Sequence, residues 1–281
     1  MSMRLILVNY DREIRKRFEN IFNHAGNSIY TASSIYEAKT IISNSPCDVV
    51  ICETYLEDGS AFDLKFYLDI SGSSARFIVT TAKGDIKTIL EALNTGDYDV
   101  IKKPFSDDEL KNIINRAVKD VIFSEKIDVR KLKAGWIEVQ IPSLENSMQR
   151  LDRFFKLIYE DYVSPEVLKD ISICFKEIVR NAIEWGHKFD VSKNIRISHM
   201  LHKDEFFIKI DDDGEGFDAS ACLRSSQNLL NKQSEREKAG LRPGGMGISI
   251  VSGLMDKVMQ NEKGNSIVFS KKIRKSNLLT I

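Results

Sequence analysis

The stretch from 177 to 182 reads Glu-Ile-Val-Arg-Asn-Ala and lies within a long helical pattern. Residues four apart on a helix project from the same face, so Glu177 and Asn181 are expected side by side. A carboxylate in that place can orient or deprotonate an attacking group. An amide oxygen can ligate a Mg²⁺ ion that phosphates already hold. The apolar neighbours Phe175 and Ile178 argue against a merely solvated polar face.

A glycine-rich turn occurs at 211–218 (DDDGEGFD), directly after a predicted strand over 206–210. Gly214 and Gly216, which are separated by one residue, let the backbone approach a ligand closely. The Asp212 carboxylate before them can accept a hydrogen bond from an exocyclic amine. A plain tight turn is the alternative interpretation, whereas a calcium loop is excluded because its full ligand pattern is absent.

A second glycine cluster, Gly244-Gly245-Met246-Gly247, precedes a predicted helix over 248–255. Backbone amides at a helix N-terminus can cradle phosphate when no side chains obstruct them, as at Gly245 and Gly247. Neither this cluster nor either of the two preceding motifs is specific alone. Their order along the chain predicts a nucleotide site.

The pattern of predicted elements indicates two α/β domains. Residues 1–122 alternate short apolar runs with helical patterns, which is typical of a doubly wound, five-stranded parallel sheet covered on both faces. The charged segment 123–135 is interpreted as a linker with partial helical character. Residues 136–281 read as a strand, two amphipathic helices, a hairpin, a helix and a last strand. Helices on one side of an antiparallel sheet make an α/β sandwich.

The composition excludes several classes of protein. With 42% hydrophobic and 29% charged residues, the chain is typical of a globular protein rather than a disordered one. Its formal net charge of zero provides no global attraction to nucleic acid or anionic lipid. The cysteines and histidines lack zinc spacing, and no signal peptide or membrane-spanning run of roughly 20 apolar residues is evident. We expect a cytoplasmic protein that binds neither nucleic acid directly nor membrane.

Three short motifs in the first domain occur near predicted strand ends: Leu56-Glu57-Asp58-Gly59, Thr81-Ala82 and Lys103-Pro104-Phe105. With the strand order, they make residues 3–122 resemble the receiver domains of two-component response regulators. That family holds Mg²⁺ with an acidic pair and phosphorylates an aspartate, to which a Thr or Ser and a Lys before a cis proline respond. The resemblance places these functions at Asn9, Tyr10, the neighbouring Asp11, Glu53, Thr81 and Lys103.

The acids that this chemistry needs are largely missing. Mg²⁺ prefers carboxylate oxygens, but the acidic pair has become an amide and a phenol, and Glu53 is one methylene longer than an aspartate. We therefore expect no phosphorylation here. In one interpretation Glu53 partly imitates a phosphorylated aspartate and pairs with Lys103. In the other, the site has degenerated and the domain remains as a dimerisation or docking surface.

The second domain, over about 136–272, resembles the GHKL-type ATPases, the fold shared by gyrase and histidine-kinase catalytic domains. The matching positions are Glu177 and Asn181, then Asp212, Gly214 and Gly216, then Gly245 and Gly247. The resemblance implies ATP and Mg as cofactors, with Asn181 binding Mg²⁺, Asp212 binding adenine and Glu177 as the candidate catalytic base. It also implies a mobile lid over 219–243.

Features of the second domain favour one branch of this family. The run Asn181-Ala-Ile-Glu-Trp-Gly-His187, the run Gly-Met-Gly-Ile-Ser-Ile-Val and the short entry into the domain are similar to the anti-sigma-factor serine kinases. Those proteins bind a sigma factor, phosphorylate a serine on a STAS-domain antagonist, and typically form homodimers. A histidine kinase needs a phosphoacceptor histidine on a dimerisation hairpin, and no histidine of this chain has that setting.

These observations leave two functions open. The first is a regulatory ATP-dependent serine/threonine protein kinase of the partner-switching type, joined to a receiver-like domain. The second is a non-catalytic regulator in which ATP controls protein docking, as an anti-sigma factor or scaffold. The presence of Glu177 permits catalysis but does not separate the two.

Overall fold

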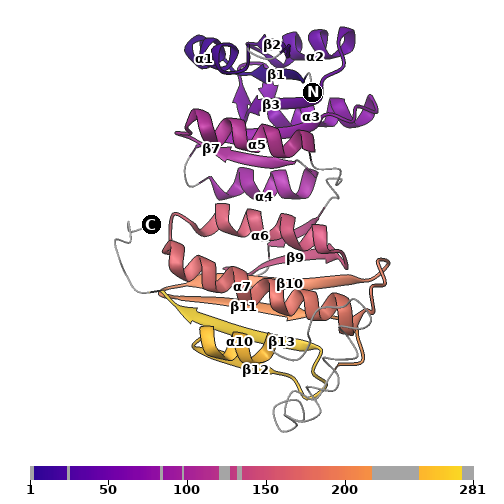
Figure 1. The fold of residues 1–281 in the computed structure, drawn as a ribbon, viewed down its shortest axis with the longest axis vertical. Helices are drawn as coiled ribbons and strands as arrows, with labels where there is room; N and C mark the ends of the chain where they lie inside the picture. The colour runs from indigo at the N-terminus through magenta and orange to yellow at the C-terminus, as the bar shows by residue number, and fades with distance from the viewer. Residues whose placement is uncertain are drawn as a thin grey trace. The chain divides into compact units, whose positions relative to one another are not determined.

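The structure is a computed structural model that describes residues 3–23, 26–82, 85–96, 98–119, 127–131, 135–216 and 247–273. The chain divides into two compact units, Met1–Ile127 and Asp128–Ile281 (Figure 1). Gly245 and the expected lid over 219–243 lie outside the described residues. Each unit has its own sheet and its own core.

The first unit is a doubly wound α/β domain, as the sequence predicts. Its five-stranded sheet has the order β2-β1-β3-β6-β7, and all neighbouring strands are parallel. The strands are β1 (Arg4–Val8), β2 (Ser28–Ala32), β3 (Val49–Glu53), β6 (Arg76–Thr81) and β7 (Asp99–Lys102). The helices are α1 (Arg12–Phe22), α2 (Ile35–Asn44), α3 (Ala61–Ile70), α4 (Ile86–Thr95) and α5 (Asp107–Lys119).

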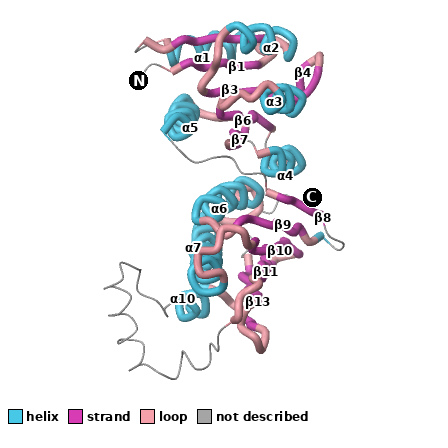
Figure 2. The backbone as a smooth tube through the Cα atoms, turned by 90° about the vertical axis from the view of Figure 1, so that its right-hand side faces the viewer, coloured by secondary structure: helices cyan, strands magenta, loops and turns pink. Residues whose placement is uncertain are grey.

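Helices cover both faces of this sheet. Phe18 and Phe22 from α1 share a core cluster with Leu110 and Ile114 from α5. Figure 2 shows α1 and α5 on one side of the strands and α3 and α4 on the other. A short hairpin of β4 (Tyr55–Leu56) and β5 (Gly59–Ser60), which the sequence shows only as a turn, follows β3. The arrangement places the carboxyl ends of the strands at one edge of the sheet.

The second unit is a six-stranded antiparallel sheet in the order β12-β13-β11-β10-β9-β8, with helices on one face (Figure 2). The strands are β8 (Asp128–Lys131), β9 (Ile137–Pro142), β10 (Asn194–His202), β11 (Glu205–Asp211), β12 (Lys257–Gln260) and β13 (Ser266–Lys272). The helical elements are α6 (Glu145–Tyr159), α7 (Pro165–Asn181), the π-helix η2 (Ala182–Gly186) and α10 (Gly247–Leu254). This is the expected α/β sandwich.

Two edge strands differ from the sequence expectation. Residues 128–131 were expected within a partly helical linker, but they form β8, which pairs with β9 at one edge of the sheet. Residues 257–260 form β12, which pairs with β13 at the other edge. Both are short: β8 contains one apolar residue, Val129, and β12 contains only Val258 and Met259, so neither has an apolar run long enough to mark a strand. Their pairing comes from the backbone of the neighbouring strand.

Helix boundaries follow local chemistry. Ser164 caps α7, its hydroxyl accepting from the Val167 amide at 3.4 Å, and Pro165 occupies the first turn. Helix α6 ends at Tyr159, where the Glu160 amide donates to the Lys156 carbonyl. Among the described residues, no helix combines the length and apolar character needed to cross a membrane.

A buried histidine lies in the core of the second unit. His199 on β10 is fully buried, and the Tyr159 hydroxyl from α6 lies 2.5 Å from its Nδ1. The rings of Phe155 and Tyr159 meet the imidazole edge-on. Burial lowers the pKa of His199 to about 3, so the ring is neutral in the folded protein near neutral pH.

This burial predicts an acid-dependent loss of stability. The unfolded chain binds a proton at His199 near pH 6.5, while the folded chain binds it only near pH 3. The unfolding free energy of the second unit should therefore fall by up to about 1.4 kcal/mol per pH unit as the pH drops through this window. Urea unfolding at pH 4–7 measures the slope.

Replacement of this residue, His199→Leu, should flatten the slope, whereas His202→Leu, at an exposed position of the same strand, should retain it. Equal slopes for both variants would contradict the assignment.

Candidate nucleotide site

Helix α7 carries Glu177 and Asn181 on one face, one turn apart. The Glu177 side chain is only 14% exposed, and the Arg180 guanidinium lies 4.0 Å from its Oε2. Arg180 is itself held by Glu145 at the start of α6, at 2.8 Å. The opposite face of α7 is anchored by buried Phe175. The two polar side chains are thus presented by a helix fixed to its core.

The N-terminus of α10 meets these two side chains directly. A Cβ built on Gly247 would lie 2.7 Å from Glu177 Oε1 and 2.9 Å from Asn181 Nδ2. Only glycine permits this approach of backbone to side chain. The structure therefore brings together Glu177, Asn181 and Gly247, which are separated widely in sequence.

The turn after β11 is fixed by its own acid. Asp212 Oδ1 accepts a hydrogen bond from the Gly214 amide at 2.7 Å, and Asn265 Nδ2 donates to the Asp212 carbonyl at 3.0 Å. Gly216 has φ +79°, and a Cβ there would overlap the Lys263 carbonyl oxygen. The turn is thereby docked against the loop before β13.

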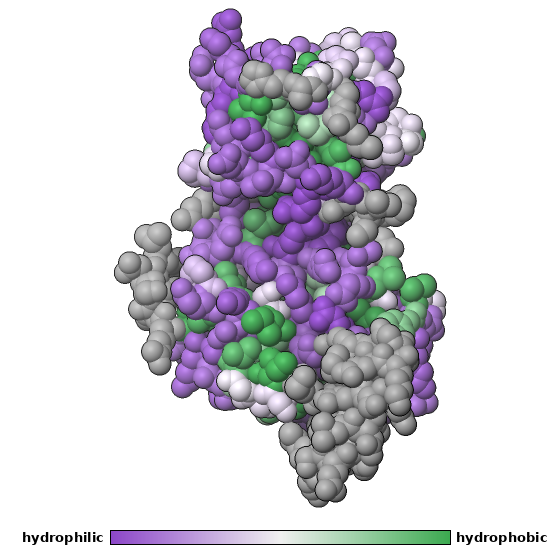
Figure 3. All heavy atoms as spheres, in the orientation of Figure 1, coloured by the Kyte–Doolittle hydropathy of each residue, from purple (hydrophilic) through white to green (hydrophobic). Residues whose placement is uncertain are grey.

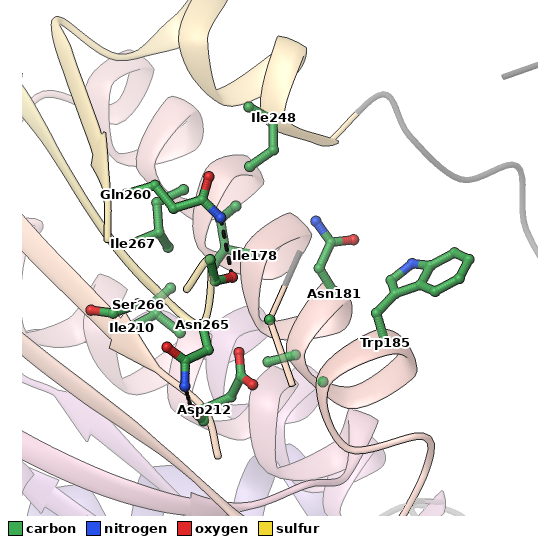
Figure 4. A pocket seen from close by; sticks show the side chains of 14 residues that line it. Ile178, Asn181, Trp185, Ile210, Asp212, Ile248, Gln260, Asn265, Ser266 and Ile267 are labelled. Carbon is green, nitrogen blue, oxygen red and sulfur yellow. Dashed lines mark hydrogen bonds between the residues drawn. The ribbon is translucent and has the colours of Figure 1, made fainter. Parts of the chain in front are cut away.

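Asp212 and a set of apolar side chains line one pocket (Figure 4). The apolar part comes from four isoleucines, two on helices and two on strands: Ile178, Ile248, Ile210 and Ile267. Burial raises the pKa of Asp212 above its ordinary value, although the Gly214 amide opposes this shift. An apolar slot with one buried acceptor suits a flat base that carries an exocyclic amine.

The residues present fit both ATP and its metal. Asp212 would hold the amine of adenine, and the isoleucines would contact the two ring faces. Asn181, which also lines the pocket, would supply an amide oxygen to Mg²⁺. Bound Mg²⁺ would neutralise phosphate charge. Among the described residues, no group of three His, Cys, Asp or Glu side chains is placed to hold a metal ion.

Several residues that line the pocket were not predicted as site residues. Trp185 from η2 and Gln260, Asn265 and Ser266 from the β12–β13 hairpin also border the pocket. Polar residues in a hairpin, such as Gln260, Asn265 and Ser266, are ordinarily solvated, so their residue types alone do not indicate a site. The tight Asn-Glu-Lys-Gly-Asn turn at 261–265 was the available signal.

The predicted receiver site is occupied by internal hydrogen bonds. Glu53 Oε2 accepts from Asn9 Nδ2 at 2.9 Å and from Thr80 Oγ1 at 3.1 Å, and it forms an ion pair with Lys103. The peptide bond between Lys103 and Pro104 is cis. Glu53 is 8% exposed and Asn9 1% exposed. The carboxylate is therefore satisfied without any added phosphate.

Three other predicted positions do not face this carboxylate. Asp11 caps α1, accepting from the Glu13 amide at 2.8 Å, and Tyr10 is 61% exposed. The expected responder Thr81 donates to Asp85 at 3.0 Å, while its neighbour Thr80 contacts Glu53 instead. Successive residues of a strand point to opposite faces, so the two threonines cannot share one target.

Comparison with known families agrees with both halves of this architecture. Residues 5–115 match the response regulator receiver domain, and residues 141–271 match the histidine kinase-like ATPase domain. The chain is a fusion of a receiver domain with a histidine kinase-like ATPase domain. This combination indicates a signalling regulator, and the second domain implies ATP binding.

The individual relatives are regulatory proteins. AlgB, the alginate biosynthesis transcriptional regulatory protein of Pseudomonas putida, is 25% identical over 131 residues, or 47% of this chain and 27% of AlgB. RegA, the photosynthetic apparatus regulatory protein of Cereibacter sphaeroides, is 29% identical over 39% of this chain and 60% of RegA. The response regulator MprA of Mycobacterium sp. strain KMS is 22% identical over 73% of this chain and 90% of MprA.

The chain spans only 26% to 30% of the length of AlgB and PilR from Pseudomonas. Among solved structures, the receiver domain of the Francisella response regulator 1452 is 23% identical, with a TM-score of 0.40, over 42% of this chain and 98% of that chain.

Alanine substitutions at two glycines of the second unit are expected to change its unfolding free energy in opposite directions. Gly216→Ala should lower its unfolding free energy by about 1–3 kcal/mol, because a side chain is strained at positive φ and overlaps the Lys263 carbonyl. A Cβ at Gly253 in α10 would meet open space, so Gly253→Ala should raise the unfolding free energy by up to about 1 kcal/mol, because alanine favours the helix. Urea titrations compare them; a Gly216→Ala protein as stable as wild type would contradict this packing.

The Glu53 site yields a second prediction. Glu53→Gln should destabilise the first unit by about 1–3 kcal/mol, since Lys103 loses its charged partner while half-buried. Glu57→Gln, at an exposed position in the adjacent hairpin, should have no such effect. If Glu53→Gln leaves dimerisation and downstream activity unchanged, the phosphate-mimic interpretation is wrong and the docking interpretation stands.

Proposed function

We propose that the second domain binds Mg-ATP and transfers phosphate to a serine or threonine of a protein partner, in the manner of the anti-sigma-factor kinases. The partner would be a STAS-domain antagonist, with a sigma factor as the alternative bound protein. The chain would act as a homodimer. In this proposal the receiver domain regulates the kinase without being phosphorylated itself.

The observation that carries the proposal is the contact of Gly247 with both Glu177 and Asn181. Phosphates bound at the N-terminus of α10 would lie beside these two side chains. Glu177 is then placed to accept the proton of an attacking hydroxyl, while Asn181 helps to hold Mg²⁺. The Arg180 guanidinium lies 4.0 Å from Glu177 Oε2, so a positive charge lies near the carboxylate.

The histidines support a hydroxyl rather than an imidazole as the acceptor. His187 and His199 are 1% and 0% exposed, and His202 ends a β-strand rather than lying on a helical hairpin. His24 lies outside the described residues. An acceptor must reach the phosphate of ATP bound elsewhere, and neither buried ring can do so without unfolding its surroundings.

A non-catalytic protein-binding regulator is the second candidate. It is favoured by exposed Ile173 on α7 and Ile250 on α10, which are 40% and 39% exposed. Figure 3 shows an apolar patch over these two helices on an otherwise largely hydrophilic face of the second unit. Exposed apolar patches commonly mark protein interaction sites.

Two substitutions separate binding from transfer. Asn181→Ala should abolish the Mg²⁺-dependent part of ATP binding, measured by calorimetry with and without EDTA, because it removes the amide ligand. Glu177→Gln should retain nucleotide binding and lower phosphate transfer by about 10²–10⁴-fold, since only the proton acceptor is lost.

Transfer is measured with labelled ATP and a STAS-domain protein from the same organism, with Gly253→Ala as the matched control. If the wild type binds nucleotide tightly but transfers no phosphate, the kinase proposal is contradicted and the non-catalytic regulator is favoured. Equal loss of binding and transfer in Glu177→Gln would assign Glu177 a structural role.

A further inference from the structure

The chain leaves α7 through an unusual turn beside the nucleotide pocket. Residues Ala182–Gly186 form a π-helix, and the His187 amide closes it by donating to the Ala182 carbonyl at 2.8 Å. Lys188 and Phe189 follow with φ of 54° and 63°. Both π-turns and left-handed non-glycine residues cost energy and concentrate at functional sites.

This turn lies directly against the residues that would recognise adenine. A Cβ on Gly186 would lie 2.5 Å from Asp212 Oδ1, and a Cβ on Gly214 would lie 2.5 Å from the Gly186 Cα. The backbone of η2 and the turn after β11 are therefore in contact at two glycines. Any shift of one element must move the other.

His187 links the same two segments by a hydrogen bond. The Asp213 amide donates to His187 Nε2 at 3.2 Å, and the side chain is only 1% exposed. Because Nε2 accepts, the ring proton must reside on Nδ1, which has no hydrogen-bond partner among the described residues. A second proton would convert Nε2 into a donor and break the link.

The charged groups around His187 lie in the turn after β11 and in the loop between η2 and β10. Asp212 and Asp213 belong to the recognition turn, while Asp190 and Lys193 belong to the loop before β10. The three carboxylates favour the protonated ring and Lys193 opposes it. Burial exceeds these effects and lowers the pKa of His187 below its ordinary value.

We propose that His187 is a positioning residue for nucleotide recognition, which fixes the Asp212–Gly214 turn through the Asp213 amide only while its imidazole is neutral. This inference rests on the proposed nucleotide binding. It adds a residue that does not line the pocket and acts through Asp212. Its consequence is that nucleotide affinity depends on the protonation of a buried histidine.

Two substitutions distinguish the loss of the hydrogen-bond acceptor Nε2 from a change in the volume of the His187 side chain. His187→Leu keeps an apolar side chain of similar size and removes the acceptor, so Mg-ATP affinity at pH 7.5 should fall by about tenfold. His187→Gln places an amide oxygen near the former Nε2 and should stay within about threefold of wild type. Calorimetric titration of the full-length protein measures both, and thermal unfolding verifies that each variant is folded.

The pH profile gives a readout that simple packing would not produce. As the pH falls below about 6.5, the wild type should lose affinity relative to His187→Gln, because only the wild type gains the ring proton. Protonation of the nucleotide affects both proteins equally and cancels in the ratio. The neutral form should persist somewhat below 6.5, since the pKa of His187 is lowered.

The outcomes separate this inference from the proposed function. If the wild type fails to bind Mg-ATP at pH 7.5, as the weakened Asp212→Asn control also does, the proposal that this pocket binds nucleotide is wrong. If the wild type binds and His187→Leu binds equally well, only the role of His187 is wrong. Equal impairment of the Leu and Gln variants, or parallel pH profiles, would also overturn it by showing that ring shape alone matters.

Discussion

The second domain depends on close contacts between backbone and acidic or amide side chains at a few glycines. Gly247 touches Glu177 and Asn181, and Gly186 touches Asp212, at separations that a Cβ would not allow. These contacts fix where the first turn of α10 and the end of α7 can lie. The walls of the pocket, the buried Asp212 carboxylate and the pair Glu177 and Asn181 are held in place by these close contacts at glycine.

The pocket is assembled from elements that carry no chemistry alone. The α7 helix contributes polar groups, the β11 strand leads into the acidic turn, and the hairpin between β12 and β13 closes the far wall. The hairpin holds the turn by reciprocal bonds between Asp212 and Asn265. An antiparallel sheet suits this purpose, because β13 pairs with β11 and so places its preceding loop next to the turn that follows β11.

In the first domain, a buried carboxylate lies where the resemblance to receiver domains expects a phosphorylated aspartate. Asn9, Thr80 and Lys103 all direct donors at one oxygen of Glu53. A buried carboxylate with these partners is stable as it stands, whereas an acidic pair would need a cation to offset its repulsion. In this structure the donors around Glu53 come from the chain itself.

Sequence periodicity alone was sufficient for both fold classes and for most strands and helices, because buried runs and amphipathic faces have a fixed period. The order of three short motifs, rather than periodicity, predicted Glu177, Asn181 and Asp212 as site residues, and Gly214, Gly216 and Gly247 lie where a Cβ would meet neighbouring atoms. Periodicity could not reveal edge strands β8 and β12, which are specified by their neighbours' backbone. Only the tertiary structure decides the contacts of Trp185, Asn265 and His187, because these contacts form when distant segments pack together. The same holds for the hydrogen bond of Glu53 with Thr80 rather than Thr81, since the local pattern does not set which side chain faces Glu53.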